Sequence, residues 1–426
     1  MDEEVVDWEV VESVTRVRYA VIGAGLTGTA AAKHLASRFG SEVCLIGPSE
    51  GQHGALGACY DEGRIYRGLD PIEVWATLAQ KSIKRYPAIA SASGIDFYRE
   101  CGILVFGVPD EYVRETERVA ASMGTDLERF DGAAAIKSRF PMIGVPASSR
   151  VVGLYQATGA GHLSPRELVE AQTALGAAAG LARISEEVRR VVKTSTSFSI
   201  ELEHGRVEAT DGVLVCAGAF TSLGGLVPDP PLDIHLAGAQ ALLCELSPKS
   251  TAALADMPCL IYEGETADRC FYLLPPIRYP DGRMFLKIGP STAFAPTLRS
   301  RSEVEAWFKR DSCTPDFIAA ARVAIKDLLP GAEVVAARPL LCVTDASPNS
   351  HPYVDLLDDA QTWGVCTAGN GWAAKSSEEL GSVAARMMAN RETHWCRDPD
   401  LPKADFVALR KEVKVEPSRR PLCALL

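Results

Sequence analysis

The sequence predicts an α/β fold of two domains, and three observations lead to this prediction. An apolar run, Tyr19–Ile22, passes through a glycine turn into a helix-forming run, Thr27 to Ser37. A second apolar run, Gly212 to Cys216, also stops at small residues, Ala217-Gly218. The chain has 426 residues, which is long for a single core, so two domains are expected. Its content of 47% hydrophobic and 23% charged residues is ordinary for a globular protein.

The glycine turn has the form Gly23-x-Gly25-x-x-Gly28 and lies between strand and helix. Gly23 permits the tight turn, Gly25 lets a pyrophosphate approach the backbone, and Gly28 lets the helix pack close to the strand. Leu26 and Thr27 open the helix, whose N-terminus then points at the phosphates. The sequence therefore predicts a Rossmann-like, dinucleotide-binding domain, with these five residues in contact with the cofactor.

The ribose contact departs from the usual pattern. An acidic residue normally ends the second strand and binds the ribose hydroxyls. Here the strand Glu42 to Ile46 is followed by Gly47, and the first acidic residue is Glu50. Two contacts remain open: Glu50 itself, or backbone groups and water.

Composition excludes several classes of partner. A formal charge of −11 argues against nucleic acid and anionic membrane as partners, and no apolar run reaches the length of a membrane span. The acidic start of the chain is unlike a secretory signal or transit peptide. Twelve cysteines lack paired metal spacing, and His162 and His351 have no ligand-spaced partner, so we expect no metal site. Reduced thiols indicate the cytoplasm or another reducing compartment.

The middle of the chain alternates helices and strands. Asp70-Pro71 precedes an amphipathic pattern, and Ser164-Pro-Arg-Glu167 has the shape of a capping box before a helix. These patterns predict, in order, a helix 72–90, a sheet segment 95–106, a helix 110–123, a loop-rich segment 153–163 and a helix 168–179.

The second half is richer in strands. Asp229-Pro-Pro231 indicates a crossing between domains. The pattern predicts strands at 207–216, 239–246, 270–274, 284–289, 336–343 and 363–367, and helices at 304–329 and 376–390. The last three dozen residues or so, rich in Pro, Lys and Arg, are expected to be peripheral.

Five separated motifs follow one another in a family-specific order: Gly23-Ala-Gly25, Gly63–Arg67, Val215–Gly218, Cys342–Asp355, and Gly369-Asn-Gly371 with the helix to Gly381. With them the chain resembles the D-amino-acid-oxidase-like flavoproteins, and within these the monomeric sarcosine oxidase family. The resemblance runs from about Tyr19 to about Asn390.

The resemblance implies a Rossmann-like FAD-binding domain with a second, mixed-sheet (α+β) substrate domain. It assigns segments 17–92, 151–229 and 343–395 to the FAD domain, segments 93–150 and 230–342 to the substrate domain, and 396–426 to a peripheral tail.

The resemblance also implies the cofactor contacts. Cys342 matches the cysteine that forms a thioether with the flavin 8-methyl group, so the FAD is expected to be covalently bound. A buried structural cysteine is the alternative. The other expected cofactor residues are Arg64, Ala217, Gly218, Gly369, Gly371 and Lys375.

For the substrate, Arg67 and Lys375 match the two cations that hold a carboxylate, and a carboxylate in a partly dry pocket needs charged donors. Tyr60 stands where the family has a His near the ring. Thr344 and Ser291 replace a larger Tyr and His, which favours a substrate larger than sarcosine or a different grip on its amine.

Three residues are expected to act in catalysis. Lys287 matches the lysine above the flavin that assists reaction with O₂, because a fixed ammonium stabilises the negative charge that develops on oxygen. The alternative is a Lys on the wet face of a half-buried strand. Arg64 is expected beside the flavin, and Tyr272 lining the pocket.

The resemblance thus implies an FAD-dependent amine oxidase that oxidises the C–N bond of a secondary or N-methylated amino acid. A hydride passes to flavin N5, and O₂ reoxidises the flavin and yields H₂O₂. Two alternatives stay open: a flavin dehydrogenase with another electron acceptor, and a flavoprotein with a structural or assembly role. Cys423-Ala-Leu-Leu426 has the form of a prenylation box, although any short tail can end this way.

Overall fold

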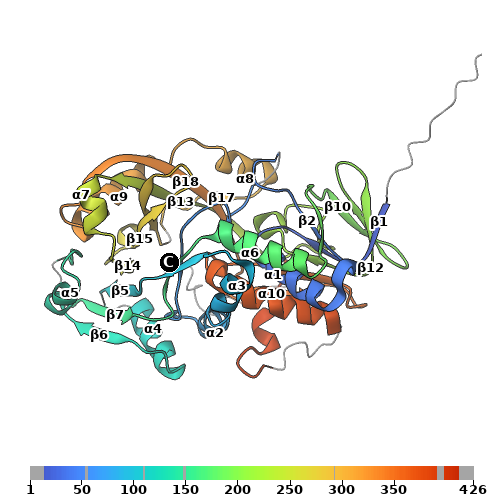
Figure 1. The fold of residues 1–426 in the computed structure, drawn as a ribbon, viewed down its shortest axis with the longest axis horizontal. Coiled ribbons are helices and arrows are strands. Elements are labelled where there is room, and N and C mark those ends of the chain that lie inside the picture. Colours follow the sequence, from blue (N-terminus) through green and yellow to red (C-terminus); the bar gives the residue numbers. More distant parts are fainter. Residues whose placement is uncertain are drawn as a thin grey trace, which may run out of the picture.

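The fold has two large sheets, one on each side of the molecule (Figure 1). A computed structural model describes residues 14–52, 56–108, 111–146, 150–291, 293–390 and 398–411. The expected prenylation box at Cys423 lies outside the described residues. The expected α/β class with two mixed-sheet units is confirmed.

The first sheet has eight strands in the order β10-β11-β12-β1-β2-β9, with β20 beside β12 and β19 beside β20. Its central pairs β1–β12, β1–β2 and β12–β20 are parallel, so their carboxyl ends meet at one edge. The strands are β1 (Val14–Ile22), β2 (Val43–Ile46), β9 (Ala182–Ile184), β10 (Arg190–Lys193), β11 (Phe198–Glu201), β12 (Arg206–Val215), β19 (Tyr353–Leu356) and β20 (Trp363–Thr367).

Helix α1 contacts both α6 and α10, and α10 also contacts α2. A core cluster joins these helices to the first sheet through residues such as Val21, Leu35, Trp75 and Leu380, each at most 2% exposed. The helices are α1 (Leu26–Phe39), α2 (Glu73–Ile83), α3 (Tyr86–Ser93), α6 (Pro165–Ala178) and α10 (Ala373–Asn390).

The second sheet has nine strands, in the order β17-β13-β16-β15-β14-β5-β7-β6 with β18 also paired to β13. The strands are β5 (Ile103–Gly107), β6 (Glu128–Asp131), β7 (Val152–Gln156), β13 (His235–Leu246), β14 (Cys259–Glu263), β15 (Phe271–Arg278), β16 (Met284–Pro290), β17 (Thr297–Leu298) and β18 (Val334–Ala346). Its helices are α4 (Glu111–Ser122), α5 (Ala133–Arg139), α7 (Pro248–Ala253), α8 (Arg301–Phe308) and α9 (Pro315–Leu328). A small third sheet contains β3 (Arg64–Tyr66), β8 (Gly161–Leu163) and β4 (Tyr98–Glu100).

Two expected helices are each divided in two. The segment 72–90 forms α2 and α3, with Pro87 in the first turn of α3. The segment 304–329 forms α8 and α9, and α9 begins at Pro315. Proline has no amide hydrogen and fits the first turn of a helix but not its interior, so each proline marks a new start.

The chain crosses between sheets at places that differ from those expected. The segment 153–163, expected as loop, contains β7 and β8, and β7 pairs with β5 and β6 in the nine-stranded sheet rather than in the sheet of β1. Strand β18 continues past the expected boundary at 342 and pairs with β13 as far as Ala346. The expected boundaries at 150 and 342 therefore each fall before the strand pairing ends.

The tail was expected to be peripheral, but its described part is docked. Leu401 and Phe406 are 0% exposed and belong to the core beneath α10. The Lys81 ammonium donates to Asp398 at 2.5 Å, and Arg410 donates to Pro228 O at 2.9 Å. A few buried apolar side chains within a polar segment were enough to hold it in place.

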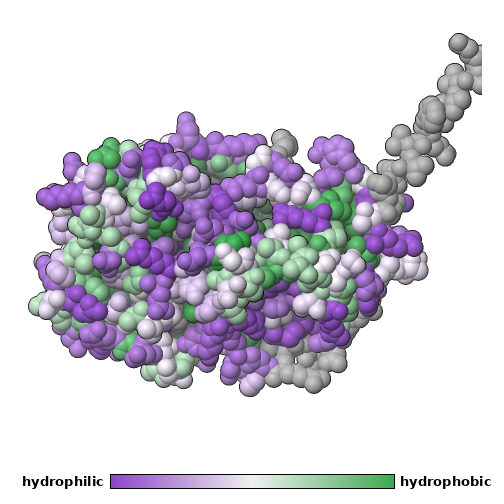
Figure 2. Space-filling view, viewed as in Figure 1, coloured by the Kyte–Doolittle hydropathy of each residue, from purple (hydrophilic) through white to green (hydrophobic). Residues whose placement is uncertain are grey.

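No helix among the described residues is long and apolar enough to cross a bilayer. Hydrophilic residues cover much of the face in Figure 2, with apolar residues in between.

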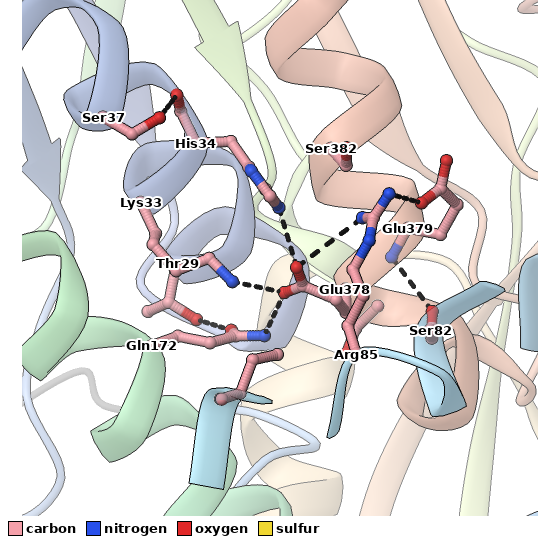
Figure 3. Close-up of polar contacts among 12 residues, drawn as sticks. Thr29, Lys33, His34, Ser37, Ser82, Arg85, Gln172, Glu378, Glu379 and Ser382 are labelled. Carbon is pink, nitrogen blue, oxygen red and sulfur yellow. Dashed lines mark hydrogen bonds and ion pairs between the residues drawn. The ribbon is translucent and has the colours of Figure 1, made fainter. Parts of the chain in front are cut away.

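One buried charge network ties α1, α6 and α10 together (Figure 3). The Glu378 carboxylate, 1% exposed, accepts from Lys33 Nζ at 2.6 Å and from Gln172 Nε2 at 3.2 Å. It also lies 2.8 Å from His34 Nε2 and pairs with Arg85 at 3.7 Å. This carboxylate therefore joins the second half of α1 to the second turn of α10, and both helices begin beside the same edge of the first sheet.

Glu378→Ala leaves the Lys33 ammonium buried without its counter-ion. Breaking a buried ion pair this way costs about 3–5 kcal/mol. We expect a loss of that size in the free energy of unfolding at pH 7, measured by chemical denaturation. The exposed Glu265 serves as the matched control, and Glu265→Ala should change little.

The loss should also shrink in acid. The pKa of Glu378 is lowered in the folded protein: burial acts to raise it, but the hydrogen bond from His34 and the Lys33 charge outweigh burial. Such a group contributes stability above its unfolded pKa, about 4.3, and loses it as the pH falls through its lower folded pKa. A difference between wild type and Glu378→Ala that stays constant down to pH 3 would contradict this role.

Candidate active site

A cavity of about 500 Å³ lies between the two large sheets. On one side it is lined by the ends of β1, β2, β12 and β20, and on the other by residues of β13, β15, β16 and β18. Crevices outside the carboxyl ends of parallel strands are where α/β sheets bind ligands.

The glycine turn has the shape that a diphosphate requires. Gly23 has φ +109°, and a side chain there would meet Cys216 O at 2.3 Å. A side chain at Gly28 would meet Gly23 O at 1.8 Å. At Gly25, by contrast, an added Cβ meets nothing within 4 Å, so the backbone is open toward the cavity that Gly25 lines. The turn is closed toward the protein and open where phosphates would lie.

A second turn, Ala368 to Gly371, faces the same cavity and is held by Asp345. The Asp345 carboxylate accepts from Thr367 Oγ1 at 2.9 Å and from Ala368 N at 2.8 Å, and Asp345 O accepts from Asn370 N at 2.8 Å. Burial raises the pKa of Asp345. Helix α10 starts directly after this turn, so two helix N-termini, those of α1 and α10, are directed at one cavity.

Most of the residues predicted from sequence meet here. The cavity is lined by Gly23, Gly25, Leu26, Thr27, Tyr60, Arg64, Arg67, Ala217, Gly218, Tyr272, Lys287, Ser291, Cys342, Thr344, Gly369, Gly371 and Lys375. Gly28 lies just behind the turn, in the packing role expected of it. Their individual roles stay predictions.

Glu50 does not reach the cavity. Its carboxylate accepts two hydrogen bonds of 2.7 Å from Arg166 of α6 and is half exposed. The geometry argues against Glu50 as a ribose ligand, because the loop after β2 turns outward to Arg166. Ile46, Gly47 and Pro48 line the cavity instead, which favours the backbone alternative.

Lys287 is buried on β16 rather than on a wet face, with 1% of its side chain exposed. Its ammonium donates to Asp61 Oδ2 at 2.6 Å and to Gly63 O at 2.8 Å. Asp61 also pairs with Arg64 and accepts from Tyr279 Oη at 2.8 Å. Burial and the Arg64 charge lower the pKa of Lys287, with Cys342 opposing the shift.

Arg67 and Lys375 lie together, but a protein carboxylate lies between them. Asp70 Oδ2 is 2.9 Å from Arg67 Nη1 and 2.9 Å from Lys375 Nζ. Burial lowers the pKa of Lys375 to about 8, with Asp70 opposing and Arg67 adding to the shift. The two cations expected for a substrate carboxylate are thus already partly compensated by the single negative charge of Asp70.

The remaining predicted residues fit a flavin-sized site. Cys342 is part-exposed toward the cavity, its thiol contacts Val343 O at 3.6 Å, and burial raises its pKa. Tyr272 lies over Gly289, and burial raises the pKa of Tyr272 to about 12. Burial likewise raises the pKa of Tyr60 to about 12.

Sequence reasoning missed the two aspartates, although a signal was present. Asp61, Arg64, Arg67 and Asp70 recur every third residue along one short segment. Each arginine has an acidic neighbour three positions away, and all four side chains are buried or part-buried. Such alternation next to a glycine-rich loop indicates compensated buried charge rather than two free cations.

The comparisons with known proteins agree with this geometry. The family described as DAO, FAD dependent oxidoreductase, matches residues 18–387. The chain belongs to this family. It is an FAD-dependent oxidoreductase, and the cavity with its two glycine turns fits that cofactor.

Three solved structures share the fold at low identity. NikD in its open form, an unusual amino acid oxidase essential for nikkomycin biosynthesis, is 18% identical with TM-score 0.75, covering 94% of this chain and 99% of NikD. L-proline dehydrogenase from P. horikoshii is 15% identical with TM-score 0.70, covering 90% and 96%. Amadoriase I from Aspergillus fumigatus is 16% identical with TM-score 0.69, covering 93% and 91%. Among curated proteins no match was found.

Gly25→Val should yield a folded protein that has lost most of its FAD. The added side chain meets no protein atom but extends into the cavity at the phosphate turn. The ratio of flavin to protein absorbance after purification measures the loss, and circular dichroism checks the fold. Gly25→Ala should give an intermediate occupancy. Full occupancy in Gly25→Val would remove the turn from the FAD site.

Proposed function

We propose that this protein is an FAD-dependent oxidase that oxidises the C–N bond of a secondary or N-methylated amino acid. Bound FAD would supply the two-electron chemistry, hydride acceptance at flavin N5 and reoxidation by O₂ to give H₂O₂. The observation that carries the proposal is the convergence of Arg67, Lys375, Lys287 and Cys342 on one cavity with the glycine turns. A reducing compartment remains part of the proposal.

The chain's own residues hold and orient the substrate. Lys375 is the cation that receives the substrate carboxylate, with Arg67 behind it. Tyr272 and Ile261 supply an apolar wall from the nine-stranded sheet. Fixing the C–H bond beside nitrogen against the reactive atom of the cofactor lowers the barrier through proximity. No side-chain base is needed at the amine if the substrate binds with its nitrogen deprotonated.

Lys287 assists the reaction with O₂. It is held in place by Asp61 and Gly63 O, so little reorganisation accompanies the development of negative charge on oxygen. One observation favours a second candidate, a dehydrogenase with another acceptor: the Asp61 carboxylate already balances the Lys287 charge.

A panel of secondary amines and amino acids, mixed anaerobically with the FAD-loaded protein, tests the function. Bleaching of the flavin by a secondary amino acid, followed by O₂ uptake on aeration, is the expected result. Bleaching without O₂ uptake would favour the dehydrogenase. A flavin that no member of the panel reduces would favour the structural or assembly role.

Lys287→Met should separate the two half-reactions. Reduction of the flavin by substrate should change little, while reoxidation by O₂ should slow by about two orders of magnitude because a preorganised charge is lost. Asp61 keeps Arg64 and the Tyr279 hydroxyl as partners, so the variant leaves no orphaned carboxylate. Stopped-flow absorbance measures both rates. An unchanged reoxidation rate would remove Lys287 from the reaction with O₂.

Cys342→Ser should release the flavin on acid precipitation, whereas the flavin of the wild-type protein should stay in the pellet. The reason is that Cys342 lies on the cavity wall at the position matching the thioether cysteine. Cys313, which is 2% exposed and outside the cavity lining, offers a matched control: Cys313→Ser should retain the covalent flavin. Free flavin in the wild-type supernatant would disprove the covalent link but would leave the proposed oxidase function open.

A further inference from the structure

Arg67 and Lys375, the two cations expected to anchor a substrate carboxylate, already share a carboxylate of the protein, that of Asp70. These two cations are called the carboxylate anchor below. Asp70 is 0% exposed, and its Oδ1 accepts from Ile72 N at 3.2 Å, just before α2. That backbone contact leaves Oδ2 directed at Arg67 and Lys375, each 2.9 Å away. Asp70 therefore occupies the position between the two cations that a substrate carboxylate would otherwise take.

Three of the five N–H donors of Arg67 are engaged by the protein. Its Nη1 donates to Leu69 O at 2.6 Å and to Asp70, and its Nη2 donates to Tyr112 Oη at 2.9 Å. The buried Glu263 of β14 adds a second negative charge that, with Tyr112 and Asp70, acts to raise the pKa of Arg67. Arg67 lines the cavity, but these three hydrogen bonds leave it fewer donors for a ligand there.

Lys375 retains hydrogen-bond donors for a ligand. Its ammonium is 3% exposed, lines the cavity and lies 5.9 Å from the ring centres of both Trp75 and Trp372. The ion pair with Asp70 is its close polar contact, and its Nζ makes no hydrogen bond of good geometry within the described chain. A lysine ammonium carries three N–H donors, so it can accept a further oxygen ligand while paired.

We propose that Asp70 is a specificity-determining residue: by binding Arg67 and Lys375 itself, it weakens the attraction of the anchor for a substrate carboxylate and leaves Lys375 as the group that receives it. The inference rests on the proposed function in one respect: it assumes that the substrate carries a carboxylate.

A substrate class follows from this charge balance. A carboxylate held by one lysine, rather than by an unopposed pair of cations, contributes less binding energy. The apolar wall formed by Ile261, Tyr272, Phe294 and Leu340 must then supply more of it. The favoured substrates are monocarboxylic secondary amino acids with an apolar ring or chain larger than that of sarcosine.

Acetate and acetamide are suitable probes because they have nearly the same shape and differ in charge. Each is titrated into FAD-loaded wild type and Asp70→Asn at pH 6, where Lys375, with a pKa of about 8, carries its proton. Flavin absorbance and calorimetry report binding. Asn at this position removes the charge and keeps one of the two side-chain oxygens, which can accept from Arg67 or from Ile72 N but not from both.

Acetate should bind Asp70→Asn on the order of tenfold more tightly than wild type, because a like charge beside the binding site is removed. Acetamide should bind both proteins within about twofold of each other. Asp256→Asn, which removes an exposed charge, is the matched control and should behave as wild type for both probes. Acetate affinity that is unchanged or weaker in Asp70→Asn would overturn the proposal.

The wild type provides an independent test if Asp70→Asn does not fold. The charged groups that face the Lys375 ammonium are Asp70 and Arg67, with Tyr112 and Glu263 beyond Arg67. Burial lowers the pKa of Lys375 to about 8, so acetate affinity should fall as the pH rises through that value, while acetamide affinity stays level. In Asp70→Asn the fall should begin at lower pH, because Asp70 raises the pKa of Lys375.

Acetate binding that is independent of pH from 6 to above 9 would also overturn the proposal, because Lys375 would not be the acceptor. These probes require no turnover. A protein that oxidises no amine therefore leaves the test intact, and an active oxidase with unchanged acetate affinity in Asp70→Asn disproves the role of Asp70 alone.

Discussion

Burying charge beside the cofactor cavity is the constraint on which the rest of this structure depends. A cation taken out of water and left alone is costly, so buried charges must be paired and hydrogen-bonded. Here the cations of the site are paired with carboxylates of the same short segment, Asp61 with Lys287 and Arg64, and Asp70 with Arg67 and Lys375. The segment from Asp61 to Asp70 thus supplies both carboxylates and the two arginines, while the two lysines come from β16 and α10.

The same principle acts behind the cavity. Glu378 of α10 pairs with Lys33 of α1 and with Arg85 of the turn before α3 (Figure 3). It thereby joins α1 and α10, the two helices whose N-termini are directed at the cavity. Asp345 performs a related task for the turn before α10, where its carboxylate binds backbone and hydroxyl donors. Cofactor binding and stability are therefore coupled, since the carboxylates that anchor the framework also set the shape of the cavity.

The pairing changes what the site offers a substrate. Two free cations would select for a carboxylate above all else, whereas a compensated pair leaves room for shape and apolar contact to decide. Likewise, a lysine bound to Asp61 offers a developing anion less charge than a free one. In the proposed function, the two aspartates therefore modulate what the cations offer to a substrate and to O₂.

The sequence alone was sufficient to predict the α/β class, the glycine turn at Gly23 and part of the cavity lining, because a strand–turn–helix pattern and the resemblance to a flavoprotein family are both local signals. It did not predict that Glu50 would turn outward to Arg166, or that the segment 398–411 would be docked, because Glu50, Asp398 and Arg410 each bind a partner more than a hundred residues away. Nor did it predict where Asp61 and Asp70 would point. Acidic side chains near arginines are common on surfaces, and only the closure of the two sheets over this segment buries them and makes pairing with Lys287 and Lys375 obligatory.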